Sequence, residues 1–294
     1  MLDWRSCSFM LRKRRGIGMS RSTWIKPLLR KEWIQNRLLF VVTFLLLSLY
    51  PTMSGLLYWL GMAYEGRTLT GWARALEKML LHNDGSTLTF LGIFLIPTIA
   101  IRLLGDERRE HTLEFLVALP ISRTQIALAK YMAGLLFVWI TVFANMLFVV
   151  IMTYLIPAAY QIGDAFRWHV ATGMVLTALY SLGFLCATVT GRRMSAYLLT
   201  ALVLFFPKLL AAIMLNIWWS DAEPLAVMQF NEWTDSLSLH AYLFMVSGNL
   251  HEGTTFALNA VMALISAAFL TLSLVLFRRN QLERNGHVMI FTSK

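Results

Sequence analysis

Six long runs of apolar residues constrain the fold of this chain more than any other feature of its sequence. Their lengths are close to or above the roughly 20 residues that cross the hydrocarbon of a bilayer as a helix. They occupy 39–60, 88–104, 126–156, 170–190, 196–218 and 256–277. With 57% hydrophobic and only 14% charged residues, the chain is too apolar for a soluble domain. The sequence therefore predicts an all-α polytopic membrane protein with six transmembrane helices.

A charged segment, 102–130, separates the second and third apolar runs. Its acidic and basic residues would each cost several kcal/mol inside hydrocarbon, so we expect it to lie in water or against another protein. They include Asp106, Glu107, Arg108, Arg109, Glu110 and Glu114. Leu113, Leu116 and Val117 recur at spacings of three and four before Pro120, which predicts a short amphipathic helix. It could lie on the lipid surface or dock against a soluble partner, and the mixed signs of its polar face favour docking.

The same segment resembles the cytoplasmic connection of ABC-2 type transporter permeases. That connection has a cluster of acidic and basic residues, a Gly-Thr-Leu-Glu-like element, a Leu-Pro-Ser/Ile-Ser turn and a Lys shortly inside the next span. The matching residues here are 112–114, 119–123 and Lys130, while His111 stands where the family commonly has Gly. The resemblance implies a coupling helix that seats in a groove of a separate ATPase. Its residues would be Glu107, Arg108, Arg109, Glu110, Thr112, Leu113, Glu114, Phe115 and Leu116.

In the coupling helix that the resemblance implies, Leu113, Phe115 and Leu116 would be the docking contacts, and the charged rim would set register and association rate. The resemblance also implies the permease subunit of an ATP-driven exporter. Its partners would be a second permease subunit, in a homodimer or heterodimer, and two copies of an ATP-binding subunit. ATP and Mg would bind those subunits, and no cofactor is expected on this chain. The sequence has no Gly-x-x-x-x-Gly-Lys-Ser/Thr phosphate loop, no His-Glu-x-x-His metal spacing and no catalytic constellation.

The distribution of Lys and Arg predicts the orientation in the membrane. Most of the 26 Lys and Arg residues fall near the two termini, in 102–130 and at 192–193, and such residues concentrate on the cytoplasmic side. Both termini are therefore expected in the cytoplasm, and the net charge of +10 reflects topology in the cell membrane rather than nucleic-acid binding. The predicted parts are a basic cytoplasmic tail (1–21), an amphipathic interfacial helix (22–37), the six-span domain (38–278) and a cytoplasmic tail (279–294).

Polar residues inside the apolar runs are candidates for function. Lys208 is a cation well inside the fifth run, where a charge is costly. It would line a substrate pathway, or else snorkel to the interface or pair with an Asn. Asn145 is the second pathway candidate, and both Asn145 and Asn259 can form hydrogen bonds between helices. The small residues that would allow such close approach are Gly183, Ala187 and Ser181.

Other functions are compatible with parts of this pattern. A secondary transporter or channel without an ATPase partner would need paired carboxylates near the midplane, and the six runs contain no Asp or Glu. A membrane anchor for a signalling ATPase fits the same sequence. Export rather than import rests on the family resemblance, which implies cargo such as lipids, peptides, antibiotics or glycans. Translation could begin at Met1 or Met19, and 220–253 could contain a re-entrant helix.

Overall fold

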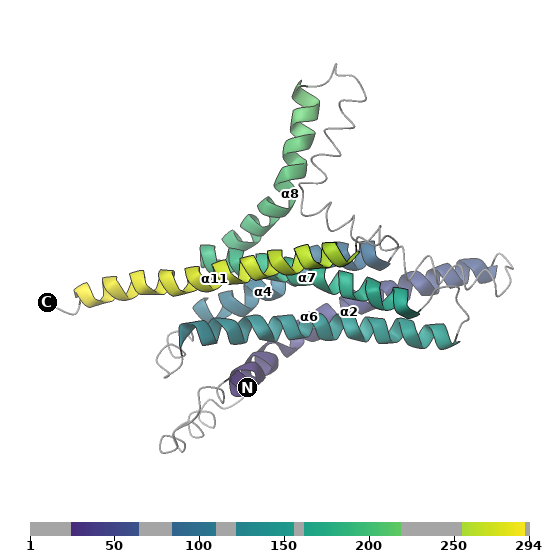
Figure 1. Cartoon of the computed structure of the whole chain (residues 1–294), viewed down its shortest axis with the longest axis horizontal. Helices are drawn as coiled ribbons and strands as arrows, with labels where there is room; N and C mark the ends of the chain where they lie inside the picture. The colour runs from purple at the N-terminus through teal and green to yellow at the C-terminus, as the bar shows by residue number, and fades with distance from the viewer. Residues whose placement is uncertain (1–24, 65–83, 110–121, 156–161, 219–254, 292–294) are drawn as a thin grey trace.

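The structure is a computed structural model that describes residues 25–64, 84–109, 122–155, 162–218 and 255–291. Within these ranges the chain forms the helices α2 (Ile25–Tyr64), α4 (Asp84–Arg109), α6 (Arg123–Leu155), α7 (Ile162–Thr190), α8 (Arg193–Trp218) and α11 (Thr255–Phe291). Figure 1 shows their arrangement. All regular secondary structure in the described ranges is α-helical, which confirms the predicted all-α class.

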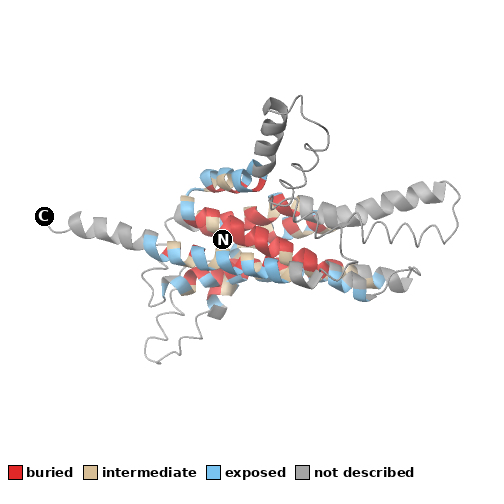
Figure 2. Cartoon of the chain, turned by 45° about the horizontal axis from the view of Figure 1, so that its top comes forward, coloured by how far each residue is buried: buried red, intermediate tan, exposed pale blue. Residues whose placement is uncertain are grey.

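Helix α7 is the centre of the bundle. It packs against α4, α6, α8 and α11, while α2 joins the bundle through α4 and α6. In α7, 83% of the apolar stretch His169–Thr190 is buried, whereas in α11 only 22% of Asn259–Arg279 is buried. Figure 2 shows the buried residues along the middle of the bundle and exposed ones along α11. The far end of α8 points away from the other helices (Figure 1).

Glycines allow the helices to approach α7 closely. A Cβ atom on Gly183 of α7 would lie 2.8 Å from Cα of Pro97 in α4. One on Gly173 of α7 would lie 2.9 Å from the ring of Trp139 in α6. Ordinary van der Waals contact begins at 3.4 Å, so a larger residue at either position would force a shift. The prediction that Gly183 permits close helix packing is confirmed.

Two local signals fix helix ends near the cytoplasmic side predicted above. The N–H of Ser122 donates to Oε1 of Gln125 at 3.0 Å, and the N–H of Gln125 donates to Oγ of Ser122 at 3.3 Å. This reciprocal capping box starts α6. Gly191 follows α7 with φ of 66°, and its N–H donates to the carbonyl oxygen of Ala187 at 3.1 Å. A residue in the left-handed region is the usual end of a helix.

The predicted apolar runs coincide with the helices. Each run lies within one helix, except that residue 156, at the end of the third run, lies outside the described residues. Within the part of the chain that the structure describes, three stretches are long and apolar enough to cross a membrane, in α6, α7 and α11. Two shorter apolar stretches are Leu91–Gly105 in α4 and Arg193–Phe206 in α8.

The helix ends differ from the predicted ends. The segment 22–37 was expected as a separate interfacial helix, but α2 continues from Ile25 through it and through the first apolar run without a break. The side-chain amide of Asn36 donates to the carbonyl oxygen of Glu32 at 3.0 Å, inside the continuous helix. Helix α4 continues to Arg109 and α11 to Phe291. Charged residues such as Glu and Arg are good helix formers, so the end of an apolar run need not end a helix.

Candidate functional site

The helices that precede and follow the predicted coupling helix lie within the described structure. Glu107, Arg108 and Arg109 form the end of α4. The remaining predicted docking residues lie outside the described residues, and they are Glu110, Thr112, Leu113, Glu114, Phe115 and Leu116. Residues 110–121, which we name the coupling segment, connect α4 to α6. These two helices are therefore its stems.

A buried ion pair joins α2 to α6 near these stems. Nζ of Lys130 lies 3.0 Å from Oε1 of Glu32, and the two side chains are only 1% and 3% exposed. Lys130 also donates to the backbone carbonyl oxygen of Leu103 in α4 at 2.8 Å. A buried ammonium is strongly disfavoured unless it has a counter-charge and hydrogen-bond acceptors, and Glu32 and Leu103 supply both. We name the Glu32 carboxylate, the Lys130 ammonium and the Leu103 carbonyl the polar node.

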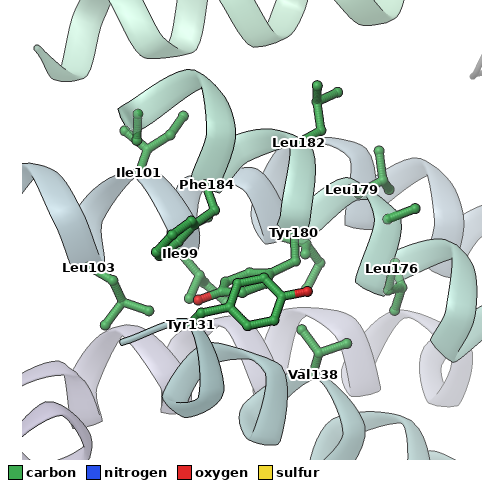
Figure 3. Packing of buried hydrophobic residues seen from close by; sticks show 14 of the residues in the cluster. Ile99, Ile101, Leu103, Tyr131, Val138, Leu176, Leu179, Tyr180, Leu182 and Phe184 are labelled. Carbon is green, nitrogen blue, oxygen red and sulfur yellow. The ribbon is translucent and has the colours of Figure 1, made fainter. Parts of the chain in front are cut away.

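Two tyrosines extend the polar node to α7. The hydroxyl of Tyr180 donates to the backbone carbonyl oxygen of Lys130 at 3.3 Å. The hydroxyls of Tyr131 and Ser181 lie 2.7 Å apart and share a hydrogen bond. The ring of Tyr131 lies 5.3 Å from that of Tyr180 and 5.4 Å from that of Phe184. Figure 3 shows these rings among buried apolar side chains. Polar and aromatic contacts therefore link α2, α4, α6 and α7 at one level of the bundle.

Asn145 forms an interhelical hydrogen bond, as predicted. Its side-chain amide donates to Oγ of Ser48 in α2 at 3.3 Å and to the carbonyl oxygen of Thr141 at 2.8 Å. The amide thus links the same two helices as the ion pair, farther along α6. The role of Asn145 in a substrate pathway stays a prediction.

The other polar candidates are less closely tied to a site. Lys208 belongs to α8, but its side chain lies outside the described part of the chain. Oδ1 of Asn259 is buried and makes no hydrogen bond with the described residues, so this atom does not form the predicted interhelical bond there. Among the described side chains, no three His, Cys, Asp or Glu residues gather as metal ligands would.

Glu32 was not among the predicted site residues, although the pair Lys31-Glu32 resembles the Lys-Glu pair that commonly precedes the first span in ABC-2 permeases. The sequence places it beside Lys31, in a segment expected at the lipid surface. A signal was nevertheless present in the spacing, because the buried face of α2 includes Leu28, Glu32, Phe40 and Leu47. Such spacing marks one face of a helix. An acidic residue within an apolar face indicates a buried cationic partner, since an unpaired carboxylate there is costly.

Comparison with known proteins assigns the chain to a family. Residues 28–282 match the family described as ABC-2 family transporter protein. The chain belongs to the ABC-2 family. The match includes Glu32, Leu103 and Lys130 of the polar node, and it spans both stems of the coupling segment. The predicted family resemblance is confirmed.

A relative of this ABC-2 protein is the probable ABC transporter permease YtrD of Bacillus subtilis (strain 168). The two are 25% identical over 272 residues, which cover 90% of this chain and 80% of YtrD. The similarity therefore extends over most of both proteins. Together with the long apolar helices, membership of the ABC-2 family makes this chain a membrane protein.

Proposed function

We propose that this ABC-2 protein is the permease subunit of an ATP-driven exporter. It dimerises with a second permease subunit and binds two copies of a separate ATP-binding subunit. The observation that carries this proposal is the family match across residues 28–282. The relative described as a probable ABC transporter permease supports it. ATP hydrolysis belongs to another polypeptide, because this sequence contains no phosphate-binding loop.

All six helices cross the membrane in this proposal, with both termini and the coupling segment in the cytoplasm. The Lys and Arg distribution and the location of each apolar run within one helix support this topology. Helix α2 has 40 residues. At 1.5 Å per residue its length is about 60 Å, roughly twice the thickness of the hydrocarbon layer. One part of α2 therefore extends into the interface, and Glu32 lies in its N-terminal half.

The coupling segment transmits the ATPase cycle to the membrane helices in this proposal. Apolar residues Leu113, Phe115 and Leu116 seat in the ATPase, and the neighbouring charges orient the contact. Movement of the ATPase displaces the segment, and α4 and α6 carry the displacement into the bundle. Lys208 and Asn145 are the candidate residues of the cargo pathway.

Purification with the bound partner tests this function. The tagged chain is extracted in mild detergent, and the proteins that co-elute are identified by mass spectrometry. We expect a P-loop ATPase in an amount comparable to the permease. Leu113→Asp combined with Phe115→Asp should release it while the permease stays in the membrane, because two carboxylates cannot occupy an apolar groove without a large desolvation cost.

A matched control places the same change in the predicted outer loop. Leu225→Asp combined with Val227→Asp should leave the ATPase bound, which separates loss of docking from general effects of added charge. Retention of the ATPase by the Leu113 and Phe115 variant would refute the docking assignment. Recovery of the parent chain alone, with transport intact in vesicles that lack ATP, would refute the ATP-driven function and favour a secondary transporter.

A further inference from the structure

Glu32 occupies a position where the packing of α2 favours an apolar side chain. The buried face of α2 carries Leu28, Glu32, Phe40, Thr43 and Leu47. A charge in such a face loses its hydration when the helices pack, and an apolar residue of similar volume does not. Pairs of well-packed apolar residues are often as stable as a buried ion pair, or more so. Stability alone therefore gives no sufficient reason for the pair of Glu32 with Lys130.

An ion pair restricts an apolar contact between two helices to one register. Apolar ridges can interdigitate again after one helix slides by a turn, about 5.4 Å. The ammonium of Lys130 contacts the Glu32 carboxylate at 3.0 Å and the Leu103 carbonyl at 2.8 Å, and a slide of α6 by one turn would break both contacts. The slide would separate the buried Lys130 ammonium from both of these acceptors, whereas Glu32 would keep only the longer contact of 4.0 Å to Lys31 of its own helix. Buried polar groups fix the register of helix pairs in this way.

The polar node lies close to both stems of the coupling segment. Leu103 is within two turns of Arg109, where α4 ends, and Lys130 is within two turns of Arg123, where α6 begins. The capping box of Ser122 fixes the start of α6. The polar node therefore relates the two stems to each other and to α2 at nearly the level where the segment leaves the bundle.

We propose that Glu32, Lys130 and the Leu103 carbonyl are a positioning device for the coupling segment. They hold α4 and α6 in one register with α2, so that a push on the segment moves the three helices together. Without the polar node, the same push would be absorbed by sliding between the stems. This inference rests on the proposed function, and it assigns Glu32 and Lys130 as positioning residues that act through residues 110–121.

The test removes both charges at once. Glu32→Met combined with Lys130→Met replaces each charged side chain with an apolar one of similar length, so no buried charge remains unpaired. A single substitution would remove the partner on the facing helix from the remaining buried charge, and loss of one partner of a buried pair is strongly destabilising. We expect the double variant to unfold at or above the unfolding temperature of the parent, because a well-packed apolar pair is often as stable as a buried ion pair or more so.

The first readout is the register of α2 against α6. Exposed positions on the two helices are converted by Arg37→Cys and Met132→Cys and carry spin labels, in a background of Cys7→Ser and Cys186→Ala. The parent complex in lipid nanodiscs should give one narrow distance distribution. The double Met variant should give a broader distribution or a second distance displaced by up to one turn, about 5.4 Å.

The second readout is coupling to the ATPase. The rate of ATP hydrolysis by the bound ATPase is divided by its rate when free, and this ratio measures the effect of the permease. In the double Met variant we expect the ATPase to stay bound but to hydrolyse ATP at nearly its free rate. The difference between the ratio and one should therefore fall at least fivefold. A role in stability alone would change neither the distance nor the ratio, and finding both unchanged in the double variant would overturn the proposal.

Two further variants sharpen the result. Thr43→Val changes a buried polar residue of the same face of α2 without touching Lys130, and it should preserve both readouts. Glu32→Lys combined with Lys130→Glu keeps opposite charges but places a carboxylate against the Leu103 carbonyl oxygen, so that two acceptors meet, and a second ammonium beside Lys31. We expect the distance distribution of this exchange variant to be as broad as that of the double Met variant. Full recovery of both readouts would show that the opposite charges alone fix the register and that Leu103 has no part in the device.

The design separates this inference from the proposed function. If the parent brings down no ATPase, the proposed function is refuted. The distance distribution then decides by itself whether the ion pair fixes the register of α2. If the parent binds and regulates an ATPase while the double Met variant does the same with an unchanged distance, the proposed function stands and the positioning role is refuted.

Discussion

The contact between Gly183 and Pro97 predicts that a single methyl group will destabilise the bundle. In Gly183→Ala the new Cβ would lie 2.8 Å from Cα and 2.9 Å from Cβ of Pro97, against an ordinary contact of 3.4 Å or more. The Pro97 atoms belong to backbone and ring and cannot rotate away. Overpacking of this kind costs about 1–3 kcal/mol. Replacement of a helical glycine by alanine gains up to about 1 kcal/mol, so the net loss is smaller.

A second glycine of the same helix supplies the matched control. A Cβ on Gly163 would have no atom within 4 Å, so Gly163→Ala changes helix propensity without changing packing. Gly163 is the second residue of α7, where alanine gains less than in the helix interior, so the difference in unfolding free energy between the two variants is a lower bound on the packing cost. We expect this difference to reach up to about 1–3 kcal/mol. It is measured by reversible unfolding in mixed detergent micelles. Equal stability of the two variants would refute the close approach of α7 and α4.

Two further predictions concern helix ends. Gly191→Ala should destabilise the protein by about 1–2 kcal/mol, because an L residue is strained at φ of 66°, and Gly191→Asn should cost less; equal losses in the same unfolding assay would contradict this. Ser122→Ala removes the side-chain acceptor of the α6 capping box and should cost about 1 kcal/mol of local stability. The N–H of Gln125 also donates to the backbone carbonyl oxygen of Ser122 at 3.0 Å, a bond that forms only together with the first turn of α6, so hydrogen exchange at this amide should still be roughly fivefold faster. Ser122→Asp should keep the exchange near the parent rate, and an unchanged rate in the Ala variant would show that the cap is dispensable.

The helices themselves could be predicted because the backbone has few alternatives in apolar surroundings. A run of about 20 apolar residues satisfies its own backbone hydrogen bonds only as a helix, unless it belongs to a closed barrel. All six runs accordingly lie within helices, apart from residue 156. Helix ends were harder to predict, since hydropathy reports where apolar residues stop and not where backbone hydrogen bonding stops. The continuation of α2 through the charged residues around Glu32 shows the difference.

The polar node could not be predicted in full because it depends on packing between distant segments. Glu32 and Lys130 are 98 residues apart in the chain. In the sequence, Lys130 was only the Lys that the family resemblance places shortly inside the third run, whereas Lys208 was the cation predicted to lie in a substrate pathway. Which of the two would be paired depends on which faces of α2, α4 and α6 meet. The acceptor from Leu103 is a backbone atom, which side-chain patterns do not report.

The position of the polar node matters because a displacement of the coupling segment moves the bundle only if α2, α4 and α6 do not slide past one another. Polar contacts join α2, α4 and α6 at the node, and Tyr180 connects it to α7. Gly183 of α7 then meets Pro97 of α4, on the side of Leu103 away from the coupling segment. Helix α4 is therefore held at two places, at Leu103 and at Pro97. Two separate contacts oppose both sliding and tilting, because α4 cannot pivot about one of them without breaking the other. If residues 110–121 receive the ATPase, their displacement therefore passes into a group of four tightly joined helices, while α11 leaves most of its apolar stretch exposed.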